Sequence, residues 1–198
     1  MKFAELKRAL LLLAIFLVLV AVIYPAVVTL AGRIAFPDKA GGSLIEKNGA
    51  VAGSRLIGQP FSDPKYFWPR PSATGSNGGS MPYDPLASGG SNLGPTNPKL
   101  VSRDPHAGEV SGAAKALRDS GVTGPLPIDL VTSSGSGLDP DITVEAARAQ
   151  AARVAAARQM SLARVQQLIN AHTNGRWLGF MGTERVNVLE LNLALDVS

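Results

Sequence analysis

The feature that most constrains this chain is a run of 24 uncharged residues, from Ala9 to Gly32. An α-helix rises about 1.5 Å per residue, so the run would form a rod of roughly 36 Å, against a bilayer core of about 30 Å. Pro25 is tolerated in a membrane helix where neighbouring groups satisfy the freed carbonyl. We therefore expect a transmembrane helix over residues 9–32, a short segment before it, 1–8, and one domain after it, 33–198.

A cleavable secretory signal is the alternative for this N-terminus. Lys2, Lys7 and Arg8 form a basic start, and the triplet TLA at residues 29–31 loosely resembles a cleavage site. The apolar run is longer than the core of such a signal, which spans about 7–15 residues. The length therefore favours a helix that stays in the membrane.

The distribution of charge indicates the orientation of the span. The three basic residues near the start outnumber Arg33, which lies close behind the span, so the positive-inside rule places the N-terminus in the cytoplasm and the domain outside. The part after the span has 16 Lys and Arg against 14 Asp and Glu, without the basic stripe that nucleic-acid binding needs. The chain has no cysteine, which excludes disulfides and thiolate chemistry.

The first half of the outer domain contains a turn signal and an aromatic cluster. Asn48-Gly49 lies between two short apolar runs and predicts a type I′ hairpin, because both residues accept a positive φ. Tyr66, Phe67 and Trp68 precede two prolines. These rings are either a local core under a loop or a partner-binding patch. Residues 72–98 hold 6 Gly, 5 Ser, 4 Pro and 3 Asn, which predicts irregular structure.

Two stretches resemble sites of chemistry without completing them. The segment GSRLIGQP, residues 53–60, has the glycine spacing of a phosphate-binding loop, but Gln59 replaces the lysine and Pro60 the hydroxyl. The segment TSSGSG, residues 132–137, lacks the first glycine of a nucleophile elbow. The two histidines, His106 and His172, have no signature beside them, and no spacing of metal ligands is present.

The second half predicts two amphipathic helices. Asp139 or Thr143 can cap the first, which runs to about Gln159. Ser161 can cap the second, which ends near Asn174-Gly175. The inward positions of the first are Val144, Ala147, Ala151, Val154 and Arg158, and those of the second are Leu162, Val165, Leu168 and Ile169. Arg148 and Arg153 are expected on a solvated face.

The tail from Arg185 to Asp196 alternates apolar and polar residues, which predicts a strand. The alternation changes phase along the tail. The apolar residues Val186 and Val188 have even numbers, whereas the leucines from Leu189 onward have odd numbers. A bulge or a tight bend near Leu189 would explain the change of phase. The predicted fold class is therefore α+β: one transmembrane helix followed by an extracytoplasmic domain with a hairpin, Gly/Pro-rich loops, two helices and a C-terminal strand.

Five blocks in the chain together resemble one family. They are GSRLIGQPF (53–61), YFWPRPSA (66–73), SGGSNLGPTNP (88–98), DLVTSSGSGLDPDI (129–142) and RVNVLELNLALD (185–196). In this order, behind a single N-terminal span, they resemble the C subunit of the bacterial Kdp potassium pump. The resemblance covers most of the chain.

The resemblance implies a non-catalytic accessory subunit in the bacterial inner membrane. In that family a channel-like subunit carries potassium, a P-type ATPase subunit is phosphorylated, and a small one-helix subunit completes the complex. No metal or firmly bound cofactor is expected in this chain. Potassium is the transported ion of the complex, and nucleic acid is not a partner.

The family's C subunit has also been described as a catalytic chaperone that raises the ATP affinity of the ATPase subunit. The nucleotide loop proposed for it corresponds here to Ser88, Gly89, Gly90 and Ser91. Such groups can cradle a phosphate. With the N-terminus inside, however, ATP and this loop would occupy opposite compartments, and the loop also fits a rigid framework fixed by its prolines.

Three further expectations concern how the domain would act. It could clamp the outer face of the channel-like subunit, with Tyr66, Phe67, Trp68, Asn92 and Asn97 as candidate contacts. Asp129, Asp139 and Asp141 could raise the local potassium concentration, although Asp139 also fits a simple helix cap. The alternative from another class is a membrane-tethered enzyme or ligand-binding module that belongs to no pump.

Overall fold

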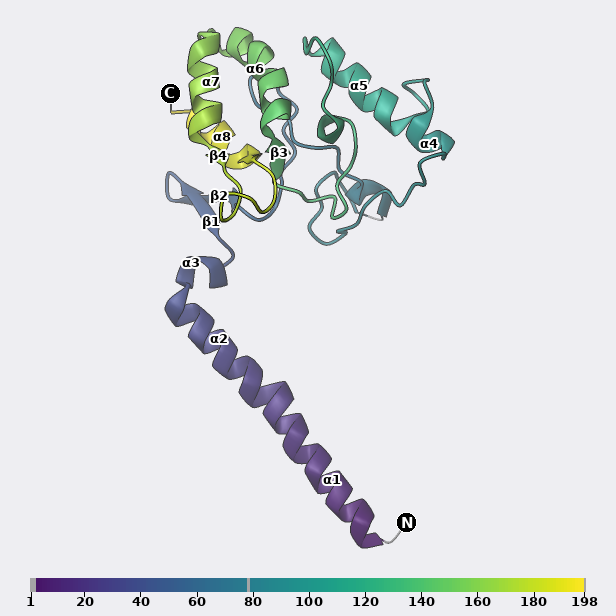
Figure 1. Ribbon diagram of the computed structural model, residues 1–198, viewed down its shortest axis with the longest axis vertical. Helices are drawn as coiled ribbons and strands as arrows, with labels where there is room; N and C mark the ends of the chain where they lie inside the picture. The colour runs from purple at the N-terminus through teal and green to yellow at the C-terminus, as the bar shows by residue number, and fades with distance from the viewer. Residues whose placement is uncertain (1–2, 78, 198) are drawn as a thin grey trace. The chain divides into compact units, whose positions relative to one another are not determined.

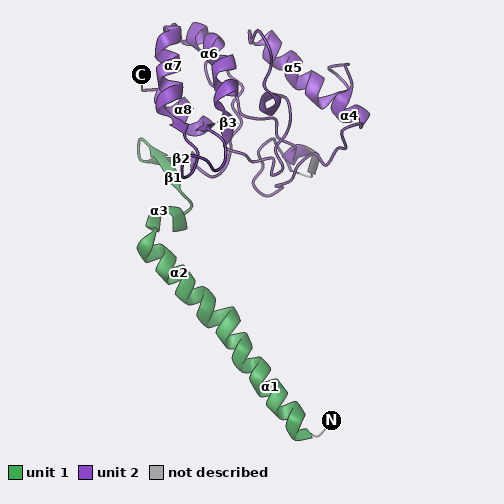
Figure 2. Cartoon of the chain, viewed as in Figure 1, with its two compact units in different colours: residues 1–52 green, residues 53–198 purple. Residues whose placement is uncertain are grey.

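The computed structural model describes residues 3–77 and 79–197. The chain divides into two units, Met1–Ala52 and Gly53–Ser198, which Figure 2 shows in different colours. The first unit consists of helices and a hairpin, and the second contains a three-stranded sheet with helices. An N-terminal apolar helix followed by a mixed domain with small sheets confirms the predicted α+β class.

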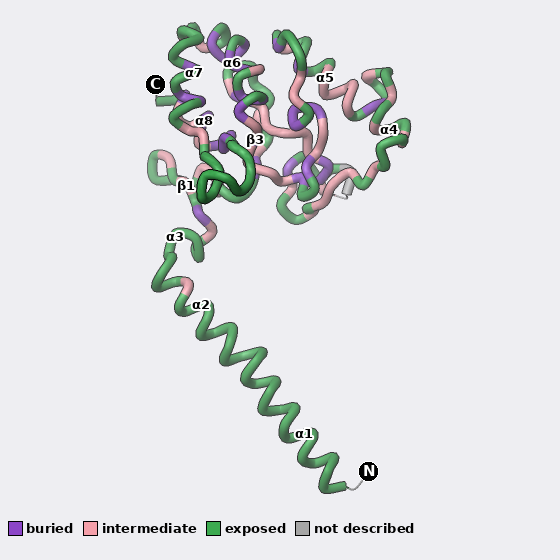
Figure 3. The backbone as a smooth tube through the Cα atoms, viewed as in Figure 1, coloured by how far each residue is buried: buried purple, intermediate pink, exposed green. Residues whose placement is uncertain are grey.

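The first unit begins with one continuous helix from Phe3 to Ala35, 33 residues long and apolar enough to cross a membrane. It comprises α1 (Phe3–Val18), a π-helical turn (Leu19–Ile23) and α2 (Tyr24–Ala35), and none of these residues is buried (Figure 3). The π turn ends two residues before Pro25. Proline lacks an N–H and crowds the preceding turn, and such widened turns accommodate a break in the hydrogen-bond ladder. The helix extends the predicted span at both ends.

A short helix, α3 (Pro37–Ala40), leads to a hairpin of β1 (Leu44–Lys47) and β2 (Ala50–Ser54). The two turn residues, Asn48 and Gly49, have φ values of 54° and 77°. Positive φ at both positions is the mark of a type I′ turn. The hairpin predicted from this residue pair is therefore confirmed.

The sheet of the second unit is antiparallel, in the order β3-β5-β4. Strand β5 (Arg185–Asn187) lies between β3 (Asp141–Thr143) and β4 (Thr173–Asn174). Val186 is the partner of Ile142 on one side and of Thr173 on the other. Strand β5 therefore forms a hairpin with β4, which directly precedes it in the chain, and also pairs with β3, which lies more than forty residues earlier.

Helices α6 (Val144–Arg158) and α7 (Leu162–Ala171) begin where the sequence predicts. Thr143 accepts a hydrogen bond from the Ala146 N–H, and Ser161 accepts one from the Arg164 N–H. The predicted inward residues are buried except for Arg158, which is partly buried, and Leu162, which is exposed, so that the expectation for Leu162 is wrong. Helix α7 ends at Ala171, three residues before the predicted stop.

The expectation of a solvated Arg153 is also wrong, because this side of α6 is covered by residues 64–68. Arg153 is only 5% exposed, whereas Arg148, one turn earlier, is exposed as predicted. Helix α6 is buried around much of its circumference. A charged residue therefore does not mark a solvated face here.

The predicted C-terminal strand is only partly present. After β5 the chain turns into helix α8 (Val188–Leu195), whose N-cap Asn187 accepts a hydrogen bond from the Glu190 N–H. The change of phase in the apolar pattern near Leu189 marks the change from a strand to a helix. The prediction of a bulged or bent strand is therefore wrong. Leu191 and Leu195, four residues apart, lie on the buried side of α8.

The core of the second unit gathers apolar residues from α6, α7, α8 and the sheet. Leu117 joins it from α5 (Glu109–Asp119), and Phe67 joins it from an irregular segment. Between residues 55 and 140 the chain is mainly loop, with α4 (Pro98–Val101), α5 and short 3₁₀ turns at Thr74–Asn77 and Ile128–Leu130. The irregular structure predicted for residues 72–98 is confirmed.

Candidate functional site

The first candidate region is the loop Ser88–Ser91, which lies against residues 134–137. The Ser88 hydroxyl and the Gly89 N–H both donate to the carbonyl of Ser136, at 3.0 and 2.8 Å. A Cβ added to Gly90 would come within 3.3 Å of the carbonyl oxygens of Ser134 and Gly135. The two glycine-rich loops thus pack backbone against backbone, and a side chain at position 90 would require these neighbours to shift by a few tenths of an ångström.

The glycine of the second loop is more tightly constrained. Gly137 has a φ of 67°, and a Cβ there would lie 2.7 Å from the Gly89 carbonyl oxygen. Its own carbonyl accepts a hydrogen bond of 2.7 Å from the Ser72 hydroxyl, and that hydroxyl also accepts the Tyr83 N–H. The Ser88 hydroxyl and the Gly89 N–H, both of which a phosphate would need, are therefore engaged inside the protein.

The other sequence candidates for catalysis have local structural roles. The Ser136 hydroxyl accepts the Leu138 N–H at 3.1 Å. His172 Nδ1 lies 2.9 Å from the carbonyl of Leu168 at the end of α7. Gly58 of the phosphate-loop-like segment donates its N–H to the Leu138 carbonyl. Each group takes part in the framework around residues 134–140 or in a helix end.

The second candidate region is the aromatic segment Tyr66–Trp68. The Phe67 ring is fully buried, and its peptide N–H and carbonyl bind the side-chain amide of Asn192 at 2.8 and 2.9 Å. The N–H and carbonyl of Trp68 bind the amide of Gln150 in the same way, at 2.8 and 3.1 Å. Two buried amides therefore pair with successive peptide groups, as a neighbouring strand would.

Two arginines fix the outer side of this segment. Arg153 lies over the Trp68 ring, 4.6 Å from its centroid, and donates to the carbonyl of Pro64 and to Gln150 Oε1. Arg158 lies 4.9 Å from the centroid of Tyr66 and bonds the carbonyl of Lys65. Burial lowers the pKa of Arg153 to about 10. We call residues 63–68, held by these side chains, the aromatic clamp.

The remaining partner-binding candidates lie in the loop after residue 91. Asn97 caps the short helix α4 by accepting the Lys99 N–H at 2.9 Å. Asn92 is exposed and has a φ of 53°, a conformation that asparagine adopts more readily than most residues. Among the described residues, no hydrogen bond joins Asn92 or Asn97 to the aromatic clamp. Partner binding by these five residues remains a prediction.

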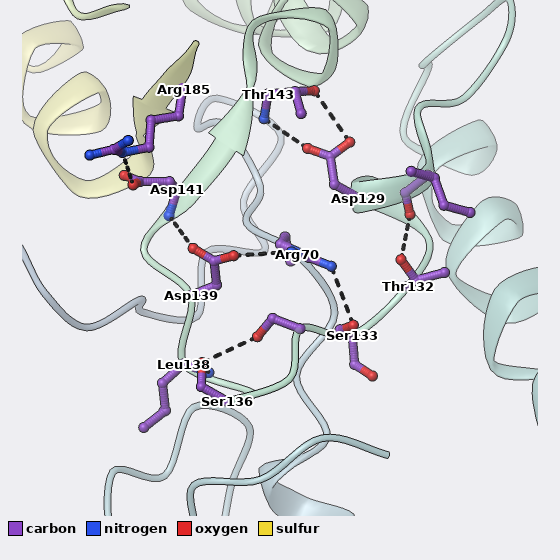
Figure 4. Close-up of polar contacts among 12 residues, drawn as sticks. Arg70, Asp129, Thr132, Ser133, Ser136, Leu138, Asp139, Asp141, Thr143 and Arg185 are labelled. Atoms are coloured by element: carbon purple, nitrogen blue, oxygen red, sulfur yellow. Dashed lines mark hydrogen bonds and ion pairs between the residues drawn. The ribbon is translucent and has the colours of Figure 1, made fainter. Parts of the chain in front are cut away.

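The third candidate region is a chain of charged groups around a small polar cavity of about 160 Å³ (Figure 4). Arg70 pairs with Asp139 at 3.0 Å, and Asp139 accepts the Asp141 N–H at 3.1 Å. Asp141 pairs with Arg185 at 2.8 Å. Asp139 therefore closes a turn. The expectation that it caps α6 is wrong, because Thr143 is the N-cap of that helix.

Asp129, the third carboxylate, is buried and accepts both the N–H and the hydroxyl of Thr143, at 2.8 and 3.3 Å. Burial raises the pKa of Asp141, although Arg185 opposes this effect. Two of the three carboxylates thus have an arginine partner, which reduces the negative field available to attract potassium. The cluster holds strand β3 in place beside residues 129–139.

The sequence reasoning missed an exposed apolar turn between β4 and β5. Trp177, Leu178, Phe180 and Met181 surround Gly179, and all four side chains are exposed. Four large apolar residues in five positions, bounded by Arg176 and by polar residues 183–185, form a signal that could have been recognised. Apolar patches of this kind mark interaction sites.

Comparisons with known proteins identify the family of this chain. Residues 6–197 match the family described as "KdpC: K+-transporting ATPase, c chain". The chain is 55% identical to a protein of Geobacter sulfurreducens and 52% identical to one of Geotalea uraniireducens, each over 97% of both chains. It is 53% identical to a protein of Methylococcus capsulatus over 96% of both. All three relatives are named "Potassium-transporting ATPase KdpC subunit". The chain therefore belongs to the KdpC family.

Proposed function

We propose that this chain is a membrane-anchored, non-catalytic accessory subunit of a potassium-transporting ATPase complex. The observation that carries the proposal is the family match over residues 6–197, which includes both the apolar helix and the folded domain. Relatives that align with this chain over 97% of both lengths are named as KdpC subunits of a potassium-transporting ATPase, which supports the proposal. ATP hydrolysis then belongs to another subunit of the complex.

The partners of this subunit are the channel-like potassium-translocating subunit, the P-type ATPase subunit and the small one-helix subunit. The domain clamps the outer face of the channel-like subunit and keeps the complex assembled. A rigid domain suits this role, and the aromatic clamp and the paired glycine loops are fixed by hydrogen bonds to side chains and carbonyls far along the chain. A preorganised surface loses little conformational entropy on binding.

We propose that the N-terminus lies in the cytoplasm and the domain outside the cell. The distribution of Lys and Arg around the helix supports this orientation. The loop Ser88–Ser91 is then a structural element and no ATP site, in keeping with the use of the Ser88 hydroxyl and the Gly89 N–H inside the domain. A chaperone effect on ATP affinity would have to act through the ATPase subunit.

The assembly role is tested by deleting residues 53–198 while keeping the helix. Purification through a tag on the channel-like subunit should then recover much less of the ATPase subunit than the intact chain does. The variant Ile128→Ser, at an exposed position, is the matched control and should recover the normal amount. A complex that stays intact without the domain would contradict the proposed assembly role.

The orientation is tested by labelling with a membrane-impermeant maleimide, because the chain has no native cysteine. Leu86, which is 95% exposed, is replaced by cysteine in one variant and Lys7 in another. We expect Leu86→Cys to react in intact cells and Lys7→Cys only after permeabilisation. The reverse pattern would place residues 88–91 in the ATP compartment and reopen the nucleotide proposal.

A further inference from the structure

The turn between β4 and β5 presents an unusual apolar surface. Trp177 is 68% exposed, Leu178 67%, Phe180 71% and Met181 47%. All residues from Asn174 to Arg185 are exposed, as the green course of the tube shows in Figure 3. Single exposed apolar side chains are common, but here four lie within five positions of one turn.

The backbone of this turn is closed on itself. The N–H of Trp177 donates to the carbonyl of Met181, and the N–H of Met181 donates back, both at 2.9 Å. Phe180 and Gly179 donate to the carbonyls of Trp177 and Arg176. A segment whose peptide groups are paired internally can leave water at low cost, because few hydrogen bonds are lost.

Leu178 occupies a conformation that leucine rarely adopts. Its φ is 52°, in the left-handed region that favours glycine and asparagine. The leucine side chain makes the turn less stable than asparagine would, and it points into solvent in the isolated domain. Strain of this kind at an exposed apolar residue suggests that the side chain serves an interaction.

A lipid surface fits this turn better than a protein does. The turn is a narrow hairpin tip, whereas a stable protein interface needs about 800 Å² from each partner. Tryptophan concentrates at the boundary between lipid headgroups and acyl chains, where its ring is apolar and its N–H remains hydrated. Leucine, phenylalanine and methionine supply the apolar surface that such shallow insertion buries.

The chain itself keeps a membrane within reach of the turn. Residues 36–52 join the apolar helix to the second unit, a connection that even fully extended would span no more than about 60 Å. Tethering raises the effective concentration of the turn at the bilayer, so that a weak interaction suffices. We propose that the Trp177–Met181 turn inserts into the interface of the bilayer leaflet facing the domain. The proposal requires the helix to span the membrane but does not require a potassium pump.

The test uses the full chain in nanodiscs whose lipids carry bromine near the top or near the end of the acyl chains. Bromine quenches tryptophan at short range, and the chain has two tryptophans, Trp68 and Trp177. The Trp177 signal is the difference between the wild type and Trp177→Phe. We expect it to be quenched most by the shallow bromines and to shift to shorter wavelength.

Two further variants make the result specific. Replacing Phe180 and Met181 together by serine should reverse the wavelength shift and most of the quenching, while leaving the Trp68 emission unchanged. As a matched control, Ile128→Trp in the Trp177→Phe background places a tryptophan at another exposed apolar position, 71% exposed in the wild type. The emission of this tryptophan should not be quenched by the brominated lipid and should be quenched by acrylamide in solution.

Trp177 emission that is insensitive to brominated lipid in nanodiscs would overturn the proposal. Shielding that appears only when the other subunits are present, together with cross-links from position 177 to one of them, would overturn it in favour of a protein partner. Neither result would bear on membership of the complex, which is tested separately by co-purification.

Discussion

Two aromatic segments of this domain have opposite environments. In the aromatic clamp, Phe67 is fully buried and Tyr66 and Trp68 lie under arginines. In the turn between β4 and β5, Trp177 and Phe180 are exposed over about two thirds of their surface. Both segments are rich in large apolar side chains, so composition alone does not separate them. The difference lies in which groups elsewhere in the chain meet their backbones.

The clamp is held by side chains that are distant in sequence. Gln150, Arg153 and Asn192 bind its peptide groups, whereas in the described part of the chain the peptide groups of the exposed turn pair with one another. An irregular segment can be buried only when its peptide groups find such partners. A turn that satisfies itself can remain at the surface and expose its side chains. The comparison therefore separates apolar residues that build the fold from those available for an interaction.

The largest expected effect comes from removing the amide that binds Phe67. Asn192→Leu keeps the branched shape, with larger methyl groups in place of the amide, and leaves the N–H and the carbonyl of Phe67 buried without partners. We expect a loss of about 3 kcal/mol in the free energy of unfolding, measured by urea titration of the full chain in detergent. Asn170→Leu, at an exposed position of α7, is the control and should change stability by about 0.5 kcal/mol or less. A loss below about 1 kcal/mol for Asn192→Leu would show that the clamp does not depend on this amide.

A smaller effect is expected from Arg153→Met. Methionine retains the apolar contact with Trp68 but leaves the Pro64 carbonyl without its donor. The loss should be about 1–2 kcal/mol, because removing a partly unsatisfied buried cation offsets part of the cost. Arg148→Met on the exposed side of α6 is the matched control. If the two variants had the same free energy of unfolding, Arg153 would not stabilise the aromatic clamp.

The two regions should also differ in their response to pH. At the clamp, the Lys65 N–H donates to Asp63 and lowers the pKa of its carboxyl. The stability that Asp63 contributes is therefore present above the ordinary aspartate pKa of 3.8 and is lost as the pH falls through the lower folded pKa. At the foot of the exposed turn, burial raises the pKa of Asp141. Its contribution has the opposite sign and is lost as the pH rises from 3.8 through the higher folded pKa.

Asp63→Asn and Asp141→Asn test this contrast by unfolding at a series of pH values between about 3 and 6. Relative to the wild type, Asp63→Asn should become less stable as the pH rises, and Asp141→Asn should become more stable. Each substitution thus removes the contribution of one carboxyl group to the pH dependence of the free energy of unfolding. Slopes of the same sign in both variants would contradict the assignment of burial as the dominant influence on Asp141.

Local signals in the sequence predicted the hairpin turn and the starts of α6 and α7 correctly. Asn48-Gly49, Thr143 and Ser161 each act within three or four residues, and the structure places a turn or a helix N-terminus at each. The tail was harder, because Asn187 both ends a strand and caps a helix. Alternation of apolar and polar residues over a few positions does not distinguish the two structures.

The candidate sites were predicted less completely because they depend on distant pairs. Nothing near Arg153 in the sequence indicates that residues 64–68 cover it, and nothing near Ser88 indicates that Ser136 accepts its hydroxyl. The exposed turn was visible as a dense apolar group, but apolar residues are more often buried than exposed. The paired backbone of Trp177 and Met181 allows this group to remain at the surface.

The smallest expected change in stability, and the sharpest test of the contrast, is at Leu178. Asparagine tolerates a φ of 52° better than leucine, so Leu178→Asn should stabilise the domain by about 0.5–1 kcal/mol in urea unfolding. Leu86→Asn, at a residue that is 95% exposed and has no positive φ, should leave stability unchanged. The same Leu178→Asn variant should weaken quenching of Trp177 by brominated lipid, because an apolar group is lost from the turn. A residue whose replacement stabilises the fold and weakens the interaction serves the interaction. A loss of stability would instead make Leu178 part of the fold, as Phe67 is.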